Sequence, residues 1–550
     1  MPLPPVADFY YLTNFLTALD WIEERHEPLL LADERDFIGD FLALEQPSQA
    51  LLVRLVMRKG PHFRASKLNY AEIGCTRRAA APLLELGWIS DRHELAFAEL
   101  LSLLRKDELV ARFRDELPSA APKKGDLAEL LAHHAEHSRS FAEWYPDLDD
   151  PLYSLVIGDL CDRLRLLFFG NLRQDWSEFV LADLGVYRYE QVPFSADSRA
   201  FRNRADLDGY LHLWRCGERF AAGLAVDEVV GLIGEFASDN PFLQSRHARL
   251  LFRLAQQLER EGELEGSLRL YQRTVFPGSR QRQIRVLERL ARLQEAHELA
   301  QMAANAPESE AEAQLVERAL VRLNRLLGLP RPARASAAAE QRFDLCLPPM
   351  GEASVELCVR DHLNEAQAPV HYVENTLINS LFGLLCWEAI FAPLPGAFFH
   401  PFHAGPADLL SADFAQRRAE LFASSFALID SGEYASKICR TWHDKFGIVS
   451  PFVYWDLLDA ELLEQALACL PAVHLKAWFE RLLLDIKANR AGMPDLIQFW
   501  PAEQRYRMIE VKGPGDRLQD NQKRWLAFCA EHGMPVEVCY VTWADEGSAP

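Results

Sequence analysis

GMPDLIQFWPAEQRYRMIEVKG, residues 492–513, decides the fold class of the C-terminal part of the chain. Two apolar stretches flank a polar turn near residues 501–504, and each stretch carries an acid. Asp495 precedes the first stretch, and Glu510 closes the second, two residues before Lys512. Alternate side chains share a face of a strand, so Glu510 and Lys512 point the same way. The pattern predicts a β-hairpin that brings Asp495 beside Glu510.

Two converging carboxylates repel each other, and burial of an unpaired charge costs several kcal/mol. A divalent cation removes this penalty, and carboxylate oxygens suit Mg²⁺ or Mn²⁺. Such an ion lowers the pKa of a bound water and stabilises charge on a phosphoryl oxygen, while a lysine ammonium supports either role. The spacing therefore predicts metal-dependent hydrolysis of a phosphodiester.

The composition is that of a globular protein with more than one core. At 550 residues, with 49% hydrophobic and 25% charged residues, we expect about three or four domains. No apolar run approaches the ~20 residues of a membrane span, and the N-terminus lacks the regions of a signal peptide. The ten cysteines form no C-x-x-C pair, which indicates a reducing, cytoplasmic location.

The net charge of −21 argues against nonspecific DNA binding, but basic residues are concentrated locally. Seven lie between Arg54 and Arg78, against the single acid Glu72. In residues 63–89 a helical pattern ends in a glycine and a short apolar segment, which is typical of a winged-helix-like module. Its candidate DNA contacts are Arg58, Lys59, Arg64, Lys67, Arg77 and Arg78. A set of solvated helix faces explains the charge equally well.

Two further helical regions carry basic residues. Residues 96–134 resemble a SAP module, a DNA-binding helical hairpin, with Lys123 and Lys124 in its loop. Residues 150–340 are almost continuously helical, and 251–275 fit one tetratricopeptide-like hairpin. Guanidinium groups near a helix start favour a phosphate site, although a solvated arginine surface is an alternative. The candidates for this phosphate site are Arg273, Arg280, Arg282, Arg285 and Arg289.

A proline-rich and alanine-rich segment at 328–341 marks the main boundary. After it, residues 343–360 suggest two strands joined by a Pro-Gly turn, and 373–391 an apolar helix. We expect a mainly α protein with a C-terminal α/β domain. Its parts are a helical, winged-helix-like domain (1–95), a SAP-like hairpin (96–149), a tetratricopeptide-like helical solenoid (150–340) and the α/β domain (341–550).

The combined motifs resemble a known family. Residues 371–543 are similar to a VRR-NUC domain of the PD-(D/E)xK nuclease class, in NSLFGLLCWEAIF, TWHDKFG, MPDLIQFW and EVKGPGDRLQDNQKRWLAF. The resemblance implies that residues 341–550 form a nuclease domain with a mixed sheet. With FYYLTNFL and MRKGPHFRASKLNYAEIG near the start, nearly the whole chain resembles bacterial members of the Fanconi-associated nucleases. The resemblance extends over the SAP-like and tetratricopeptide-like regions as well.

The resemblance implies roles for individual residues. Asp495, Glu510, the carbonyl of Val511 and Glu374 would hold the metal, and Lys512 would be the catalytic lysine. Gln522 and Lys523 would face the substrate phosphate. From the residues alone, the upstream acid is either Glu374 or Glu388, since both lie at the apolar helix of residues 373–391.

The implied function is a structure-selective 5′-flap endonuclease and 5′-to-3′ exonuclease in interstrand crosslink repair. It would act on branched or flapped duplex DNA, as a monomer or a DNA-induced dimer, in the nucleoid-associated cytoplasm. Two alternatives stay open. One is a Holliday-junction-resolvase-like or restriction-type nuclease, and the other is a non-catalytic DNA-repair scaffold.

Overall fold

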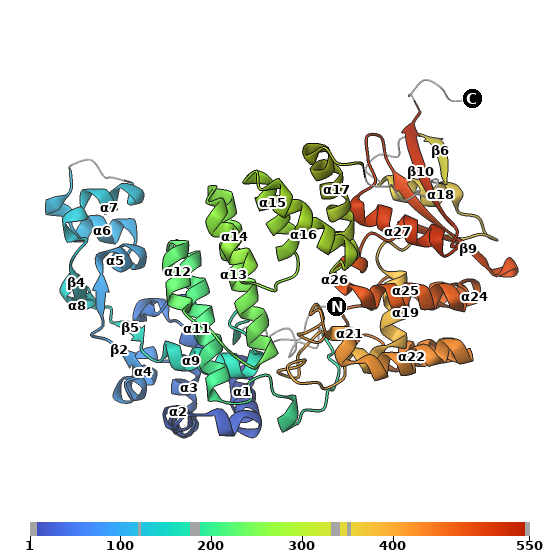
Figure 1. Cartoon of the computed structure of the whole chain (residues 1–550). Helices are drawn as coiled ribbons and strands as arrows, with labels where there is room; N and C mark the ends of the chain where they lie inside the picture. Colours follow the sequence, from blue (N-terminus) through green and yellow to red (C-terminus); the bar gives the residue numbers. More distant parts are fainter. Residues whose placement is uncertain (1–7, 119–122, 177–186, 332–340, 349–353, 545–550) are drawn as a thin grey trace. The chain divides into compact units, whose positions relative to one another are not determined.

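The computed structural model describes residues 8–118, 123–176, 187–331, 341–348 and 354–544, and the chain forms two compact units (Figure 1). The first unit is residues 1–188 and the second is residues 189–550. Most of the predicted linker, residues 332–340, lies outside the described residues. The finer division into four domains stays a prediction.

The first unit begins with helices that pack on a small sheet. The helices are α1 (Tyr10–His26), α2 (Ala32–Ala43), α3 (Gln46–Val56), α4 (Thr76–Glu85) and α9 (Gly158–Phe169). The antiparallel sheet has the order β1 (His62–Arg64), β5 (Leu152–Leu155), β2 (Ile89–Ser90). Between α4 and β2 the chain turns at Gly87, whose φ of 71° favours glycine. The helix and the glycine at the end of residues 63–89 are as the sequence predicts, and the short apolar segment leads into β2. The helical pattern is wrong for the start of this stretch, where Phe63 and Arg64 belong to β1.

The SAP-like region of the first unit has its own small core around Trp144. Its elements are β3 (Glu94–Ala96), α5 (Phe97–Leu103), α6 (Lys106–Arg112), η3 (Arg114–Glu116), η4 (Lys124–Asp126), α7 (Leu127–Leu130), η5 (Ala132–His134), β4 (Ser138–Ser140) and α8 (Phe141–Trp144). Trp144 is fully buried, and its indole N–H donates to the carbonyl of Leu95 at 3.0 Å. This bond ties α8 to the β3–β4 pair, so the two ends of the module are joined.

The second unit opens with a stack of antiparallel helices, drawn in green to olive in Figure 1. They are α11 (Arg204–Ala221), α12 (Val226–Ile233), α13 (Pro241–Glu261), α14 (Leu264–Gln272), α15 (Ser279–Arg289), α16 (Leu293–Asn305) and α17 (Glu310–Leu327). From α13 onward each helix packs on the next along the chain, as in a solenoid. Ala255 and Tyr271 are fully buried between α13 and α14, as the repeat pattern predicts.

A five-stranded mixed sheet follows, in the order β6-β10-β9-β8-β7. The strands are β6 (Arg342–Leu347), β7 (Val370–Tyr372), β8 (Leu496–Trp500), β9 (Arg505–Lys512) and β10 (Val536–Trp543). β10 runs parallel to β6 and β9, whereas β8 is antiparallel to both β9 and β7. The predicted mixed sheet of the C-terminal domain is therefore present.

Helices flank this sheet, and most of them lie between β7 and β8 in the sequence. They are α18 (Val355–Leu363), α19 (Leu377–Leu385), α20 (Trp387–Ile390), α21 (Phe414–Arg417), α22 (Ala419–Ser431), α23 (Tyr434–Asp444), α24 (Ala460–Cys469), α25 (Ala472–Leu484), α26 (Ile486–Asn489) and α27 (Asp520–Glu531). One continuous core joins α19, α25 and the hairpin strands, including Phe382, Trp478 and Phe499. The helical insertion therefore packs directly on the predicted hairpin.

One expected strand is wrong. The second half of residues 343–360 forms helix α18, not a strand after a turn. Ser354 caps its start, because the Ser354 hydroxyl accepts a hydrogen bond from the Leu357 amide at 3.5 Å. The turn itself, 349–353, lies outside the described residues.

Two expectations from composition can be compared with the structure. All ten cysteines are free thiols. No helix in the described part of the chain has both the length and the apolar character needed to cross a bilayer.

Candidate active site

The hairpin β8–β9 forms with the predicted turn. Its register pairs Leu496 with Ile509 and Trp500 with Arg505, and the chain reverses at Gln504, which has φ of 51°. Asp495 lies one residue ahead of this ladder. Its Oδ2 accepts a hydrogen bond from the Val511 amide at 2.8 Å, so the carboxylate extends the ladder beyond the end of β8.

The acids and the lysine of the hairpin are buried together. Asp495, Glu510 and Lys512 are 6%, 0% and 8% exposed. Lys512 Nζ lies 2.6 Å from Glu510 Oε1 as an ion pair. Even so, neither oxygen of Glu510 accepts a hydrogen bond of ordinary geometry from the described residues. A buried carboxylate with spare acceptor capacity fits a divalent cation, because the ion would satisfy the oxygens that the protein leaves unmatched.

Burial and mutual repulsion raise the pKa of both acids. For Glu510 the largest cause is burial, followed by the charge of Asp495, and Lys512 opposes them only in part. For Asp495 burial again comes first, the Val511 amide lowers the pKa, and Glu374 raises it. The site therefore lacks positive charge. A divalent ion would supply it and would hold both carboxylates ionised.

Glu374 reaches this site from the neighbouring strand. β7 pairs with β8 so that Tyr372 faces Leu496, and the Val373 amide donates to the Asp495 carbonyl at 2.8 Å. The Glu374 carboxylate accepts hydrogen bonds from the Tyr372 hydroxyl at 2.6 Å and from Asn375 Nδ2 at 3.1 Å. Glu374 acts electrostatically on Asp495 and on Glu510. The structure thus brings all four predicted site residues to one edge of the sheet.

Asn375 is a residue of this region that the sequence analysis missed. Its φ is 54°, and its side chain bridges two segments, because Oδ1 accepts from the Met493 amide at 3.1 Å while Nδ2 donates to Glu374. Asn379 in turn donates to the Asn375 carbonyl at 2.7 Å. Asn tolerates the left-handed region better than most residues. Asn375 therefore fixes Glu374 relative to the loop that carries Asp495.

Glu356 was also missed, because the sequence analysis expected a strand where α18 begins. The charge of Glu356 raises the pKa of Asp495 and of Tyr372, so it faces the same site. By contrast, Glu388, the alternative upstream acid, is an exposed residue paired with Lys437. Glu388 is not among the groups that shift the pKa of Asp495 or Glu510. The geometry therefore favours Glu374 over Glu388.

Gln522 and Lys523 lie in the first turn of α27. Gln522 caps this helix, since its Oε1 accepts from the Gln519 amide at 2.8 Å. Lys523 is exposed. Their expected contact with a substrate phosphate stays a prediction.

The basic residues of the first unit divide into exposed and internal groups. Arg64 is only 6% exposed and pairs with Asp150 at 2.7 Å and Glu108 at 2.8 Å. Its guanidinium group is therefore used in ion pairs inside the first unit. Its expected DNA contact is accordingly not retained. Lys124 Nζ donates to the Leu104 carbonyl at 2.8 Å, although the residue as a whole is exposed. The other candidates are exposed: Arg58, Lys59, Lys67, Arg77, Arg78 and Lys123.

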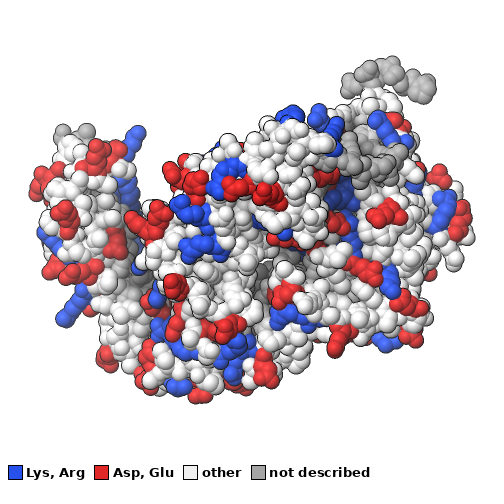
Figure 2. Space-filling view, in the orientation of Figure 1, with Lys and Arg blue, Asp and Glu red and all other residues white. Residues whose placement is uncertain are grey.

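The arginines of the solenoid also separate into two groups. Arg282, Arg285 and Arg289 converge on one carboxylate, Glu259, at 3.4, 3.3 and 3.7 Å. They line an open pocket of about 420 Å³ with Gln256, Glu259 and Arg260. Arginine and lysine side chains gather over α13 and α14 in Figure 2, among acidic neighbours.

Arg280 does not line this pocket and instead forms a two-pronged contact with Glu312, at 2.9 and 2.5 Å. Arg273 is exposed and also lies outside the lining. The pocket holds four arginines against one glutamate, so it carries net positive charge.

Three domain families match the sequence. The VRR-NUC domain matches residues 429–543, "FAN1, HTH domain" matches 9–90, and the Fanconi anemia-associated nuclease SAP domain matches 94–144. The first match contains Asp495, Glu510 and Lys512. Glu374 lies ahead of it, so its assignment to the site depends on the β7–β8 pairing and on its hydrogen bonds with Tyr372 and Asn375.

Full-length relatives and solved structures are similar over nearly the whole chain. The Fanconi-associated nuclease 1 homolog of Pseudomonas aeruginosa is 59% identical, over 97% of this chain and 96% of the relative. Human Fanconi-associated nuclease 1 is 24% identical over 97% of this chain, which spans 62% of the human protein. A crystal structure of paFAN1 bound to 2nt 5′ flap DNA with a gap has a TM-score of 0.91 at 57% identity, over 99% of this chain and 100% of that one. A second complex, with a 1nt 5′ flap, has a TM-score of 0.90.

Proposed function

Because the chain belongs to the Fanconi-associated nuclease 1 family, we propose that it cuts 5′ flaps and trims DNA from 5′ to 3′ in interstrand crosslink repair. The family membership makes it a structure-selective nuclease. The flap specificity is supported by the similarity to paFAN1, which was crystallised with 5′ flap DNA. The site of action would be the nucleoid-associated cytoplasm.

The observation that carries this proposal is the buried, hydrogen-bond-deficient carboxylate of Glu510 beside Asp495 and Lys512. Nucleases of the PD-(D/E)xK type use a divalent metal, and oxygen ligands favour Mg²⁺ or Mn²⁺. Glu374, Asp495, Glu510 and the Val511 carbonyl would hold it. A residue in a strand points its N–H and C=O toward the same side. The Val511 carbonyl therefore lies on the edge where its amide meets Asp495.

The metal would supply charge that lowers the pKa of an attacking water and neutralises the phosphoryl oxygens. The protein's own contribution is to position the groups around it. Lys512, held against Glu510, orients a water or stabilises the negative charge that develops on phosphate. Tyr372 and Asn375 hold Glu374 toward the same edge, which limits the reorganisation needed when the substrate arrives.

The pocket of Arg282, Arg285 and Arg289 is the best candidate for the 5′ phosphate. Its guanidinium groups share a single carboxylate, so they keep donors for an anion, whereas Arg280 is occupied by Glu312. Duplex DNA would also meet the exposed basic residues of the first unit, Arg58, Lys59, Lys67, Arg77, Arg78, Lys123 and Lys124, and Gln522 and Lys523 at the nuclease centre.

The proposal is tested on a 5′-flap substrate with Mg²⁺ or Mn²⁺. Asp495→Asn and Lys512→Met should abolish cleavage but leave DNA binding within a few-fold. Glu374→Gln should lower the rate strongly, whereas the matched control Glu388→Gln should cleave normally. Full activity of Asp495→Asn would reject the assignment. Equal cleavage of a four-way junction and of the flap would instead favour the resolvase-like alternative.

A second measurement addresses the phosphate pocket. The double variant Arg282→Gln with Arg285→Gln should lose the preference for a 5′-phosphorylated flap over an unphosphorylated one. Arg273→Gln, an exposed arginine of the same helical stack outside the pocket, is the control and should keep that preference. If the double variant keeps it too, the pocket does not bind the 5′ phosphate.

A further inference from the structure

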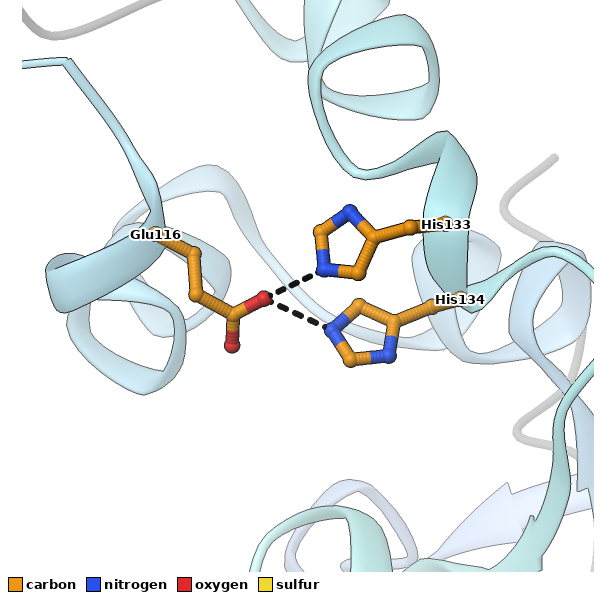
Figure 3. A group of neighbouring side chains, drawn as sticks. All are labelled: Glu116, His133 and His134. Carbon is orange, nitrogen blue, oxygen red and sulfur yellow. Dashed lines mark hydrogen bonds and ion pairs between the residues drawn. The ribbon is translucent and has the colours of Figure 1, made fainter.

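Three side chains of the SAP-like module, none of which has a role assigned above, converge at one point (Figure 3). Glu116 Oε2 lies 2.7 Å from His133 Nε2 and 2.8 Å from His134 Nε2. The three ligand atoms all lie within 4.8 Å of one another. In the described part of the chain, this is the one group of three or more His, Cys, Asp or Glu residues whose ligand atoms are that close. Glu116 ends η3, and the two histidines end η5.

The donor set is that of a zinc site. Zn²⁺ is commonly bound by imidazole nitrogen and carboxylate oxygen in tetrahedral geometry, often with three protein ligands and one water. Here both imidazoles present Nε2 to the same carboxylate oxygen.

The ring of His134 is held rigidly, whereas that of His133 is open to solvent. The His134 ring packs against Phe97 and Phe113, each at 5.3 Å between ring centroids, and edge-on against Trp144 at 5.7 Å. These contacts fix the direction of its Nε2. The side chain of His133 is 56% exposed, which gives the ion an entry path and a position for water.

The three ligand atoms lie within 4.8 Å of one another and must adjust to surround an ion. Ligand atoms around a tetrahedral zinc lie about 3.3 Å apart, so the Glu116 oxygen must withdraw by roughly half an ångström from each nitrogen. Glu116 is about one-third exposed and free to make that movement. The metal takes the Nε2 lone pair of each neutral imidazole, so the proton that Nε2 donates to Glu116 without metal passes through solvent to Nδ1.

We propose that Glu116, His133 and His134 bind Zn²⁺ and that the ion joins the segment after α6 to the segment after α7. Lys123 and Lys124 lie between these two attachment points in the sequence. Zinc would therefore link the two ends of the segment that carries both lysines. It stabilises the module because it binds the folded arrangement of the three ligands, which the unfolded chain lacks. This site is independent of the nuclease centre and of its metal.

The test uses the full-length protein, freed of metal and then held in excess Mg²⁺ so that the nuclease centre is occupied. Wild type should bind one more equivalent of Zn²⁺ than His133→Ala or Glu116→Gln. Co²⁺ should give the visible absorption band of a tetrahedral nitrogen and oxygen site in wild type, and lose it in both variants. Zn²⁺ should raise the Tm of wild type by a few degrees but leave these variants unchanged.

His137→Ala is the matched control, because His137 is an exposed histidine whose ring lies 5.7 Å from that of His134 without joining the group. It should bind Zn²⁺ like wild type. His133 is exposed, so His133→Ala should fold normally, which its metal-free Tm will verify. Wild-type zinc stoichiometry and Tm shift in either His133→Ala or Glu116→Gln would overturn the proposal.

Discussion

Glu510 combines complete burial with a single close donor, the Lys512 ammonium, and its energetics link folding to metal binding. An ionised carboxylate in this position is costly, because Lys512 supplies one positive charge while Asp495 and Glu374 add negative charge. Burial, with Asp495 adding to it, raises the pKa of Glu510 from 4.5 to about 8, and burial raises that of Asp495 from 3.8 to about 6. Without metal, the folded protein thus holds protons that the unfolded chain releases.

The first prediction follows from that difference. Since the folded state binds more protons between the unfolded and folded pKa values, stability without metal should fall as the pH rises from about 4 to about 8. Added Mg²⁺ should stabilise more strongly at the upper end of this window, where protons no longer compete. Tm measured against pH, with chelator and with Mg²⁺, checks both trends. Glu510→Gln should weaken the dependence of Tm on pH measured with chelator. The same dependence in this variant and in wild type would show that Glu510 does not cause it.

The second prediction concerns Asn375 as a positioning residue. Asn375→Gly keeps the left-handed backbone but removes the bridge between Glu374 and the Met493 amide. Misplacement of a metal-binding acid by about 1 Å costs up to ~100-fold, so kcat should fall by about 10- to 100-fold. The affinity for DNA should stay the same. Gln504→Gly, the other left-handed residue of this region, lies in the hairpin turn and should cleave like wild type. A normal kcat for Asn375→Gly would exclude the positioning role.

At the scale of elements, the approach to β8 depends on a close contact with α27. Gly492 has φ of 90°, and a Cβ there would lie 2.6 Å from Asn521 Nδ2 and 2.9 Å from Asn521 Cβ. Gly515 has nearly the same φ, 88°, with nothing within 4 Å of the added carbon. An alanine at Gly515 would therefore add backbone strain alone, whereas an alanine at Gly492 would add backbone strain and steric overlap.

The third prediction uses this pair. Gly515→Ala should cost about 1 kcal/mol, the strain of an alanine in the left-handed region. Gly492→Ala should cost roughly 1–3 kcal/mol more, because Asn521 and the start of α27 must move. It should also weaken metal binding, since the loop leads into Asp495. Denaturant unfolding and Mn²⁺ titration provide the measurements. Equal losses of stability in both variants would show that the overlap is relieved at no cost.

The sequence predicted these elements unevenly, and the physical reasons differ. The β8–β9 hairpin was predictable because alternating apolar residues and a polar turn have a short-range signature. Helix α18 was not, since its few apolar residues suit a strand as well as a helix and the Ser354 cap is a weak signal. Arg64 was misjudged because its partners, Glu108 and Asp150, are distant in sequence. Asn375 and the Glu116 group depend on tertiary contacts in the same way.

At the scale of the whole molecule, helix α17 of the second unit connects the solenoid, which carries the pocket of Arg282, Arg285 and Arg289, to the nuclease domain. Three contacts connect this last solenoid helix to the nuclease helices: Glu310 with Arg481 of α25, Arg318 with Asp520, and Gln314 with Arg524, the last two on α27. Arg481 is 3% exposed and also lies over the rings of Trp525 and Phe528. The Arg318–Asp520 pair, in contrast, is nearly half exposed on both sides.

The fourth prediction compares these two ion pairs. Glu310→Ala leaves the buried guanidinium of Arg481 without its counter-ion, which should destabilise the second unit by about 1–3 kcal/mol, below the fully buried range because Glu310 is itself 39% exposed. Arg318→Ala removes an exposed pair and should cost less than about 1 kcal/mol. Denaturant unfolding followed by tryptophan fluorescence, with Trp525 beside Arg481, measures the difference. Because added salt screens exposed pairs, about 1 M NaCl should erase the small effect of Arg318→Ala but preserve most of that of Glu310→Ala. If both variants unfold alike at low and high salt, the docking of α17 rests on apolar packing and not on the buried arginine.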